Sequence, residues 1–364
     1  SSDLRLKGGR SMIVIADDIT GAAEMAGIAW SKGYDVRLMI QGDEWPLSVI
    51  ATDTRSMTEA EAVAETRRIT SAFSHQPSAF FKKTDSALRG HVVAELVALM
   101  DTIGYERAVY LPANPSKGRV IRNGVYYIAG VPIHKTAFSF DPEFPAKSSL
   151  LNERFPDAEA HHIVMPDAET IDDVKHIVAE YNDGSTLFAG AADLFHAVLA
   201  SCDEVFPLRP PHTLDDSKKE SDTLILCGST QSKPLTIGLP IAPMPLEIYD
   251  GSDNLRLWDV TAYDERHSLI LTIPHTHRTG RDVAIHLRKM MAAMARQLVD
   301  KHLPSHLIIE GGATAWATLQ ALGWHLFSIE REFAPGVVQM RASNGTLLTL
   351  KPGSYPWEQT KERI

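Results

Sequence analysis

The chain alternates short apolar runs with stretches in which apolar residues recur every three or four positions. In the first two hundred residues several apolar runs have strand length and no polar alternation, as is typical of strands covered on both faces. This rhythm predicts a mostly parallel sheet flanked by helices. Strands are predicted at 12–16, 35–40, 47–52, 79–83, 107–111, 161–165 and 186–190, and helices at 19–32, 59–73, 91–103, 171–181 and 191–201.

The same alternation starts again after a polar, proline-bearing stretch without period. A chain of 364 residues exceeds the roughly 250–300 residues at which one core stops growing, so two α/β domains are predicted. We place them at residues 1–210 and 222–364, with 211–221 as the linker. Second-half strands are predicted at 222–227, 268–273, 307–310 and 347–351, and helices at 281–301 and 313–322.

Two adjacent carboxylates follow the first strand. Asp17 and Asp18 stand where the run 12–16 ends, and Thr20 and Gly21 open the next helix. Ligands of open α/β sheets bind outside the carboxyl ends of the strands, which makes the pair a candidate site. The alternative is that one Asp caps the helix while the other is solvated.

Charged groups also follow the next two buried strands, with Arg55 in one loop and Lys83, Asp85 and Arg89 in the other. Carboxyl ends of parallel strands share one sheet edge, so these groups are expected to converge with Asp17 and Asp18. Arginine grips a carboxylate with two parallel hydrogen bonds, and aspartate accepts from hydroxyls. The set therefore suits a small polyhydroxylated acid.

An irregular segment interrupts the first half at 112–145. Its Asn123-Gly124 pair predicts a hairpin excursion. Asn114, Lys117 and Arg119 could close over a ligand, or they could be ordinary charges of a surface loop; the pattern leaves both open.

Three turns of the second half suit a phosphate. Gly311 to Thr314 joins a strand to a helix N-terminus, where free amides and the helix dipole favour anions. Ser229 and Gly353 lie in two further turns of the same kind after strands. The three turns could together hold a nucleotide, although paired glycines also serve close helix–strand packing.

Composition narrows the class of protein. The net charge of −10 argues against broad nucleic-acid binding, and no apolar run reaches transmembrane length. Two cysteines without a zinc-type spacing fit a reducing, cytoplasmic setting. His275 and His277 are not expected to bind a metal. Neither a GxGxxG fingerprint after the first strand nor a GxxxxGK[ST] loop is present, which argues against a nicotinamide-dependent dehydrogenase and a P-loop enzyme.

Four motifs in order resemble the four-carbon acid sugar kinase family, whose members phosphorylate threonate, erythronate or 3-oxo-tetronate. They are Ala16-Asp-Asp-Ile-Thr-Gly21, Lys82-Lys-Thr-Asp-Ser-Ala-Leu-Arg-Gly90, Pro112-Ala-Asn-Pro-Ser-Lys-Gly-Arg119 and Gly311-Gly-Ala-Thr314. The resemblance implies an N-terminal acid-sugar domain, a C-terminal ATP domain and an active site in the cleft between them. It also implies ATP and Mg²⁺ as cofactors, with Mg²⁺ bridging the nucleotide phosphates.

Residue roles follow as hypotheses from this resemblance and from the chemistry of phosphoryl transfer. Asp18 or Asp17 accepts the proton of the attacking terminal hydroxyl. Five residues of the first half bind the acid sugar: Arg55, Lys83, Asp85, Arg89 and Gly90. Six residues of the second half bind ATP: Ser229, Gly311, Gly312, Ala313, Thr314 and Gly353.

The sequence departs from the family pattern in the second half. Ala313 stands where the family turn carries an acid, and the loop after Lys351 differs from the usual one. A relative that binds ligand or nucleotide without catalysis therefore stays open as the alternative. So do the identity of the four-carbon acid and assembly into a homo-oligomer.

Overall fold

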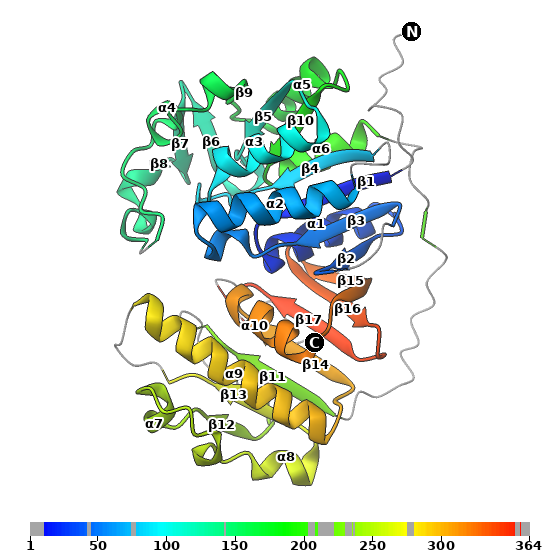
Figure 1. The fold of residues 1–364 in the computed structure, drawn as a ribbon, viewed down its shortest axis with the longest axis vertical. Coiled ribbons are helices and arrows are strands. Elements are labelled where there is room, and N and C mark those ends of the chain that lie inside the picture. Colours follow the sequence, from blue (N-terminus) through cyan, green and yellow to red (C-terminus); the bar gives the residue numbers. More distant parts are fainter. Residues whose placement is uncertain are drawn as a thin grey trace. The chain divides into compact units, whose positions relative to one another are not determined.

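The computed structural model describes residues 11–41, 45–73, 78–141, 143–202, 208–209, 222–229, 235, 237–274, 280–353 and 357. The linker predicted at 211–221 and the pair His275 and His277 lie outside these ranges. The chain divides into two compact units (Figure 1), each described by itself below. Unit 1 comprises Ser1–Ala29, Gly33–Val36 and Asp43–Leu208; unit 2 comprises Trp30–Lys32, Arg37–Gly42 and Arg209–Ile364.

Unit 1 is built on six parallel strands in the order β3-β1-β4-β10-β5-β9. The central strands are buried along their whole length, which explains their unbroken apolar runs. The strands are β1 (Ser11–Ala16), β3 (Leu47–Ala51), β4 (Ser78–Lys83), β5 (Arg107–Leu111), β9 (Ile163–Val164) and β10 (Thr186–Gly190). The helices are α1 (Ile19–Ser31), α2 (Glu59–Phe73), α3 (Val92–Ile103), α4 (Leu151–Arg154), α5 (Ile171–Tyr181) and α6 (Ala192–Ala200).

Local signals in the sequence set several of these boundaries. Thr58 and Glu61 exchange hydrogen bonds at the start of α2, which is the arrangement of a capping box. Asn123 and Gly124 both have positive φ and form the turn between β6 (Arg119–Arg122) and β7 (Val125–Ile128). The predicted hairpin is therefore confirmed, and β8 (Val131–Pro132) extends it to a three-stranded antiparallel sheet.

Unit 2 combines five parallel strands, β12-β13-β11-β14-β17, with the antiparallel strands β16, β15 and β2. Helices α9 and α10 pack against each other beside this sheet (Figure 1). The strands are β2 (Arg37–Met39), β11 (Thr223–Cys227), β12 (Ile241–Pro243), β13 (Leu269–Thr272), β14 (His306–Glu310), β15 (Leu326–Ala334), β16 (Val337–Ala342) and β17 (Leu347–Lys351). The helices are α7 (Leu246–Tyr249), α8 (Thr261–Arg266), α9 (Arg281–Lys301) and α10 (Gly312–Leu322).

Three features of the sheets differ from the sequence prediction. The strand predicted at 35–40 is shorter, and it pairs antiparallel with β15. The hairpin of β15 and β16 is absent from the prediction, and so is strand β12, which pairs parallel with β13. A three-residue strand contributes few hydrogen bonds of its own, so the edge available to it decides where it pairs.

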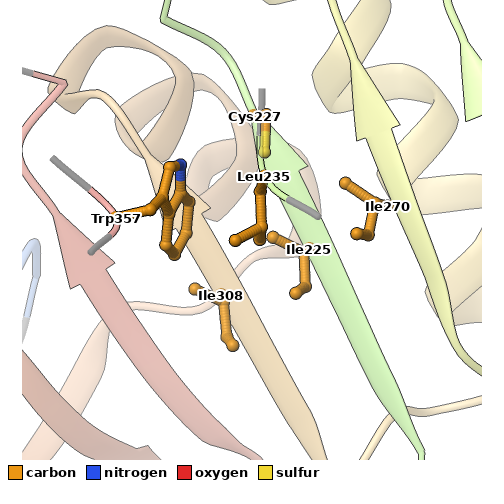
Figure 2. Close-up of a cluster of buried hydrophobic side chains, with 6 residues drawn as sticks. All are labelled: Ile225, Cys227, Leu235, Ile270, Ile308 and Trp357. Carbon is orange, nitrogen blue, oxygen red and sulfur yellow. The ribbon is translucent and has the colours of Figure 1, made fainter. Parts of the chain in front are cut away.

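A tight apolar cluster in unit 2 lies beside the turns that end β11 and β14 (Figure 2). Burial raises the pKa of the Cys227 thiol to about 12, which leaves it an inert core residue. The cluster consists of Ile225, Cys227, Leu235, Ile270, Ile308 and Trp357. None of the helices in the described ranges combines the length and apolar character that crossing a membrane requires.

Candidate functional site

The two carboxylates that follow β1 have different surroundings. Asp17 is buried, with 3% of its surface exposed, whereas the side chain of Asp18 is 15% exposed. Asp18 accepts hydrogen bonds from the Gly21 amide (2.9 Å) and the Thr20 hydroxyl (2.5 Å) at the start of α1. The helix-capping alternative is thus correct for Asp18, but Asp17 is not a solvated residue.

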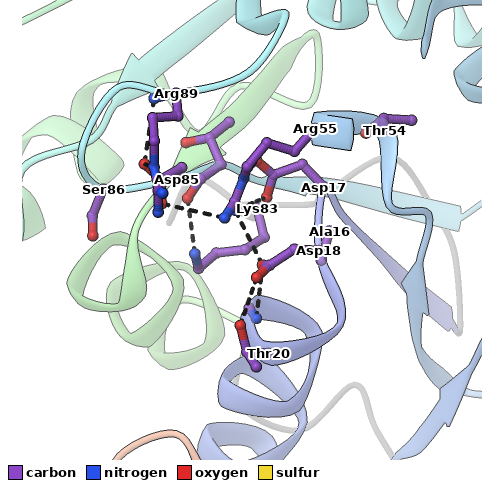
Figure 3. A network of polar contacts seen from close by, with 12 residues as sticks. Ala16, Asp17, Asp18, Thr20, Thr54, Arg55, Lys83, Asp85, Ser86 and Arg89 are labelled. Atoms are coloured by element: carbon purple, nitrogen blue, oxygen red, sulfur yellow. Dashed lines mark hydrogen bonds and ion pairs between the residues drawn. The ribbon is translucent and has the colours of Figure 1, made fainter. Parts of the chain in front are cut away.

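Arg55 joins three carboxylates of unit 1 (Figure 3). Its Nε and Nη2 each donate to one oxygen of Asp17 at 3.0 Å, which is the bidentate geometry of a strong pair. The same Nη2 lies 3.1 Å from Asp18 Oδ1, and Nη1 lies 3.6 Å from Asp85 Oδ1. The convergence predicted for the ends of β1, β3 and β4 is therefore present in the structure.

The loop after β4 supplies the remaining predicted groups. Arg89 donates from Nε (2.9 Å) and Nη2 (3.0 Å) to the two oxygens of Asp85. Lys83 donates to the Thr84 carbonyl at 2.8 Å, and its Nζ lies 3.8 Å from Glu24 Oε2. Each of these cations thus has an internal partner.

Two glycines bring backbone close to the carboxylates. Gly90 has φ +95°, and a Cβ placed on it would lie 3.5 Å from Asp17 Oδ2. A Cβ on Gly21 would lie 2.5 Å from Asp18 Oδ1 and 3.3 Å from Lys83 Nζ. Both positions therefore need glycine, Gly90 for its left-handed backbone and Gly21 for the space beside Asp18.

The three carboxylates differ in the direction in which their pKa values are shifted. Burial raises the pKa of Asp17 by more than Arg55 lowers it. Burial also acts on Asp18, but Arg55 and the other nearby donors outweigh it and lower the pKa of that carboxyl. For Asp85, Arg55 and Arg89 overcome burial and hold the pKa far below its usual range. Asp18 and Asp85 are therefore anionic at neutral pH.

Several residues of this cluster lie outside the set predicted from the sequence. Glu24 accepts from Lys117 at 2.6 Å and so links α1 to the loop before β6. Asp141 lies 3.6 Å from Arg89 Nη1, and the Phe138 ring lies 6.0 Å from the Arg89 guanidinium. Glu24 carried a signal, because it follows Gly21 by three residues and so shares its helix face, and Asp141 stands in an Asp-Pro pair that resembles the family's mid-domain loop.

The three residues singled out in the irregular segment have separate roles. Asn114 is buried, and its side-chain oxygen accepts from the Asp193 amide, which is a structural contact. Lys117 pairs with Glu24. Arg119 donates from Nη1 to Ser86 Oγ at 2.6 Å, directly beside Asp85 in the chain.

A fully buried ion pair holds the loop that carries Arg55. Lys82 Nζ lies 2.6 Å from Glu95 Oε2, and both side chains are at most 2% exposed. Glu95 also accepts from the Thr54 hydroxyl at 2.8 Å. Since Thr54 precedes Arg55 in the chain, this pair fixes the backbone that presents the Arg55 guanidinium.

The three predicted turns of unit 2 lie together. A Cβ on Gly228 would lie 2.0 Å from Thr314 Oγ1, so the first turn packs directly on the start of α10. Ser229 Oγ donates to the Gly353 carbonyl at 3.3 Å, which joins the first turn to the third. Gly311 has φ +94° at the N-terminus of α10, whose first amides have no acceptor within the helix. This cradle of small residues and amides fits a phosphate.

Among the residues that the structure describes, the cradle offers no unpaired carboxylate for a cation. Glu310 is buried and pairs with Lys351 at 2.6 Å, and Ala313 has no ligand atom in its side chain. Over the described ranges, no three His, Cys, Asp or Glu side chains are grouped so as to hold a metal ion. The residues present therefore fit a nucleotide phosphate but not a protein-bound Mg²⁺.

Two family models match successive parts of the chain. A family model described as a sugar-binding N-terminal domain matches residues 12–184. A second, described as a nucleotide-binding C-terminal domain, matches residues 260–355. The first contains the carboxylate and arginine cluster, and the second contains the α10 turn and Gly353.

Several curated proteins are similar to the chain. A D-erythronate kinase of Heliobacterium modesticaldum is 31% identical over 153 residues, and a D-threonate kinase of Salmonella typhimurium is 33% identical over 149. These matches cover 39% of this chain and only about a third of each relative, 34% and 35%. A D-threonate kinase of Cupriavidus necator is 26% identical over 383 residues, covering 90% of this chain and 89% of the relative.

A solved structure shows the same fold over nearly the whole chain. The crystal structure of a Haemophilus influenzae protein has a TM-score of 0.67 and 20% sequence identity, and it covers 96% of this chain and 99% of that one. The two family models together match well over half of the 364 residues, in the predicted order. The chain therefore belongs to the four-carbon acid sugar kinase family.

Proposed function

We propose that the protein is an ATP-dependent kinase that phosphorylates the terminal hydroxyl of a four-carbon acid sugar such as threonate, erythronate or 3-oxo-tetronate. The observation that carries the proposal is the partly exposed, anionic Asp18 beside a cluster of arginines at the carboxyl end of β1. The sugar-binding and nucleotide-binding family models, and relatives named as kinases of these acids, support it.

Asp18 is the proposed general base, and Asp17 is the proposed positioning residue. Both oxygens of Asp17 are already taken by Arg55, and the group is buried. Asp18 accepts from Thr20, Gly21 and Arg55, but 15% of its side chain is exposed, so it can accept the proton of a substrate hydroxyl. The oxygen of the substrate hydroxyl forms the new bond to the γ-phosphorus while the bond from this phosphorus to the β,γ-bridging oxygen breaks, and ADP leaves.

Unit 2 is proposed to hold the nucleotide. The first amides of α10, at Gly312 and Ala313, and the hydroxyl of Ser229 would bind phosphate oxygens in the cradle closed by Gly353. Mg²⁺ would travel with the phosphates and neutralise part of their charge, since kinases usually bind it largely through substrate. Transfer requires the γ-phosphate to reach the hydroxyl bound beside Asp18.

Turnover of a panel of four-carbon aldonates with ATP, followed by ADP release, tests the function. Positioned general bases contribute about 10²–10⁴-fold, so Asp18→Asn should lower kcat by that factor with little change in KM. Asp17→Asn should instead act through Arg55 and raise KM as well. Near-normal turnover in both variants refutes the base assignment, and a wild-type protein that phosphorylates no acid of the panel refutes the function.

A relative that binds ligand or nucleotide without transferring phosphate is the second candidate, because Ala313 removes the acid of the family turn and Glu310 is tied to Lys351. Calorimetric titration with ATP and with its non-hydrolysable analogue separates the two candidates. Nucleotide binding with substrate turnover supports the kinase. Binding without turnover supports the second candidate.

A further inference from the structure

Four cations of the proposed acid-sugar site already lie within ion-pair distance of carboxylates of the chain. Arg55 is shared by three carboxylates, and Arg89 lies between Asp85 and Asp141. Lys83 and Lys117 both lie within ion-pair distance of Glu24. A substrate carboxylate that approached any of these four cations would have to compete with an internal carboxylate.

Arg119 is different. Within the described part of the chain, no carboxylate lies within ion-pair distance of its guanidinium. Its Nη1 donates to the neutral Ser86 hydroxyl at 2.6 Å, its side chain also interacts with the Tyr126 hydroxyl, and its guanidinium carbon lies 5.9 Å from the centroid of the Phe138 ring. The same ring lies 6.0 Å from Arg89, so one aromatic side chain faces both arginines.

The backbone holds Arg119 in place. Its carbonyl accepts from the Asn114 amide at 2.7 Å, and its own amide donates to the Asn114 carbonyl at 3.1 Å. The side chain is half-buried at the start of β6. A guanidinium held against an aromatic ring loses little conformational freedom on binding and is weakly hydrated, which favours bidentate recognition of a carboxylate.

We propose that Arg119 binds the carboxylate of the acid sugar, with Ser86 and Phe138 orienting its guanidinium, and so makes the enzyme select acids over neutral polyols. This rests on the proposed function, and it divides the substrate between two groups. Asp18 takes the reacting hydroxyl at one end, and Arg119 takes the carboxylate at the other. Arg55 and Arg89 then order the carboxylates between them.

The test compares each four-carbon acid with its primary amide, which keeps the hydroxyls and loses the charge. A charge-assisted pair is worth about 1.5–3 kcal/mol, so Arg119→Gln should lower kcat/KM for the acid by roughly 10- to 150-fold. The amide should change less than about twofold. Arg119→Lys should recover part of the loss, because it keeps the charge without the planar fork.

Arg122→Gln is the matched control, because Arg122 lies on the same strand but is exposed and pairs with Glu169. It should leave both substrates unchanged. If Arg119→Gln affects acid and amide equally, or neither, the inference is wrong while the kinase stands. If the wild type binds the acid in calorimetry without phosphorylating it and Arg119→Gln abolishes binding, the kinase proposal fails and the inference stands. If the wild type neither binds nor phosphorylates any acid, both fail.

Discussion

Replacing Lys82 with methionine should destabilise unit 1 more than any surface change in it. The substitution keeps an unbranched side chain of similar length but removes the charge that faces Glu95 at 2.6 Å. Glu95 would then remain 2% exposed with only hydroxyl donors, Thr54 at 2.8 Å and Thr66 at 3.4 Å. Hydroxyls do not replace a full positive charge, so a buried carboxylate is left uncompensated.

The magnitude follows from burial. Removing one partner of a fully buried pair costs about 3–5 kcal/mol. For a unit of roughly 150–250 residues, each kcal/mol lowers Tm by about 2–4 °C, so the transition of unit 1 should fall by about 6–20 °C. Removing both charges in Lys82→Met/Glu95→Leu should recover most of this, leaving about 1 kcal/mol for the acceptor that Thr54 loses.

Scanning calorimetry measures the shift, and hydrogen exchange locates it. Amides of β4 and α3 should lose protection while those of β14 and β17 keep it. Unit 2 offers a matched pair, Lys351 and Glu310, at the same 2.6 Å and equally buried. Lys351→Met should therefore lower the protection of the β14 and β17 amides instead of those of β4 and α3. A shift below 2 °C in Lys82→Met, or a double variant no more stable than the single one, refutes this account of the pair.

Three further predictions follow from the glycines and the charges. Gly228→Ala places a Cβ 2.0 Å from Thr314 Oγ1, so ATP affinity in calorimetry should fall at least tenfold while acid-sugar affinity stays unchanged; equal loss of both ligands contradicts it. Gly21→Ala places a Cβ 2.5 Å from Asp18 Oδ1, so kcat should fall at least tenfold while Tm changes little, since only the end of the Asp18 side chain has to shift; wild-type kcat contradicts it. The lowered pKa of Asp85 stabilises the fold fully above the unfolded value of about 3.9, and this contribution is lost as pH falls toward the folded value. The Tm of the wild type should thus fall more steeply than that of Asp85→Asn between about pH 5 and pH 2.5, and parallel curves contradict it.

The sequence predicts those parts of the fold that local patterns determine. Buried runs such as 12–16 and 107–111 are strands in the structure, and the helix predicted at 171–181 begins and ends at those residues. The pairing of β2 with β15 is not local, because the two segments are nearly three hundred residues apart. The alternating β15 has a strand pattern, but the regular strand–helix rhythm gave no reason to expect an antiparallel hairpin.

The candidate site shows the same limit at the level of side chains. Strand ends predict that Asp17, Arg55 and Asp85 gather at one edge, and they do. Which cation is left without a carboxylate depends on distances of a few ångströms between loops. The sequence presents Arg55 and Arg119 as similar charges, whereas the structure surrounds the first with acids and gives the second a hydroxyl and an aromatic ring.

Asp17 and Asp18 illustrate why adjacent identical residues need not share a role. Asp17 continues the buried strand, so its carboxylate lies under Arg55 and is tied by two hydrogen bonds. Asp18 belongs to the start of α1, where the Gly21 amide and the Thr20 hydroxyl hold it with 15% of its side chain exposed. A carboxylate that must bind substrate has to be accessible, and one that must position an arginine does not. The turn from β1 into α1 therefore divides the two tasks between neighbouring residues, and exchanging their surroundings would require moving the end of the strand.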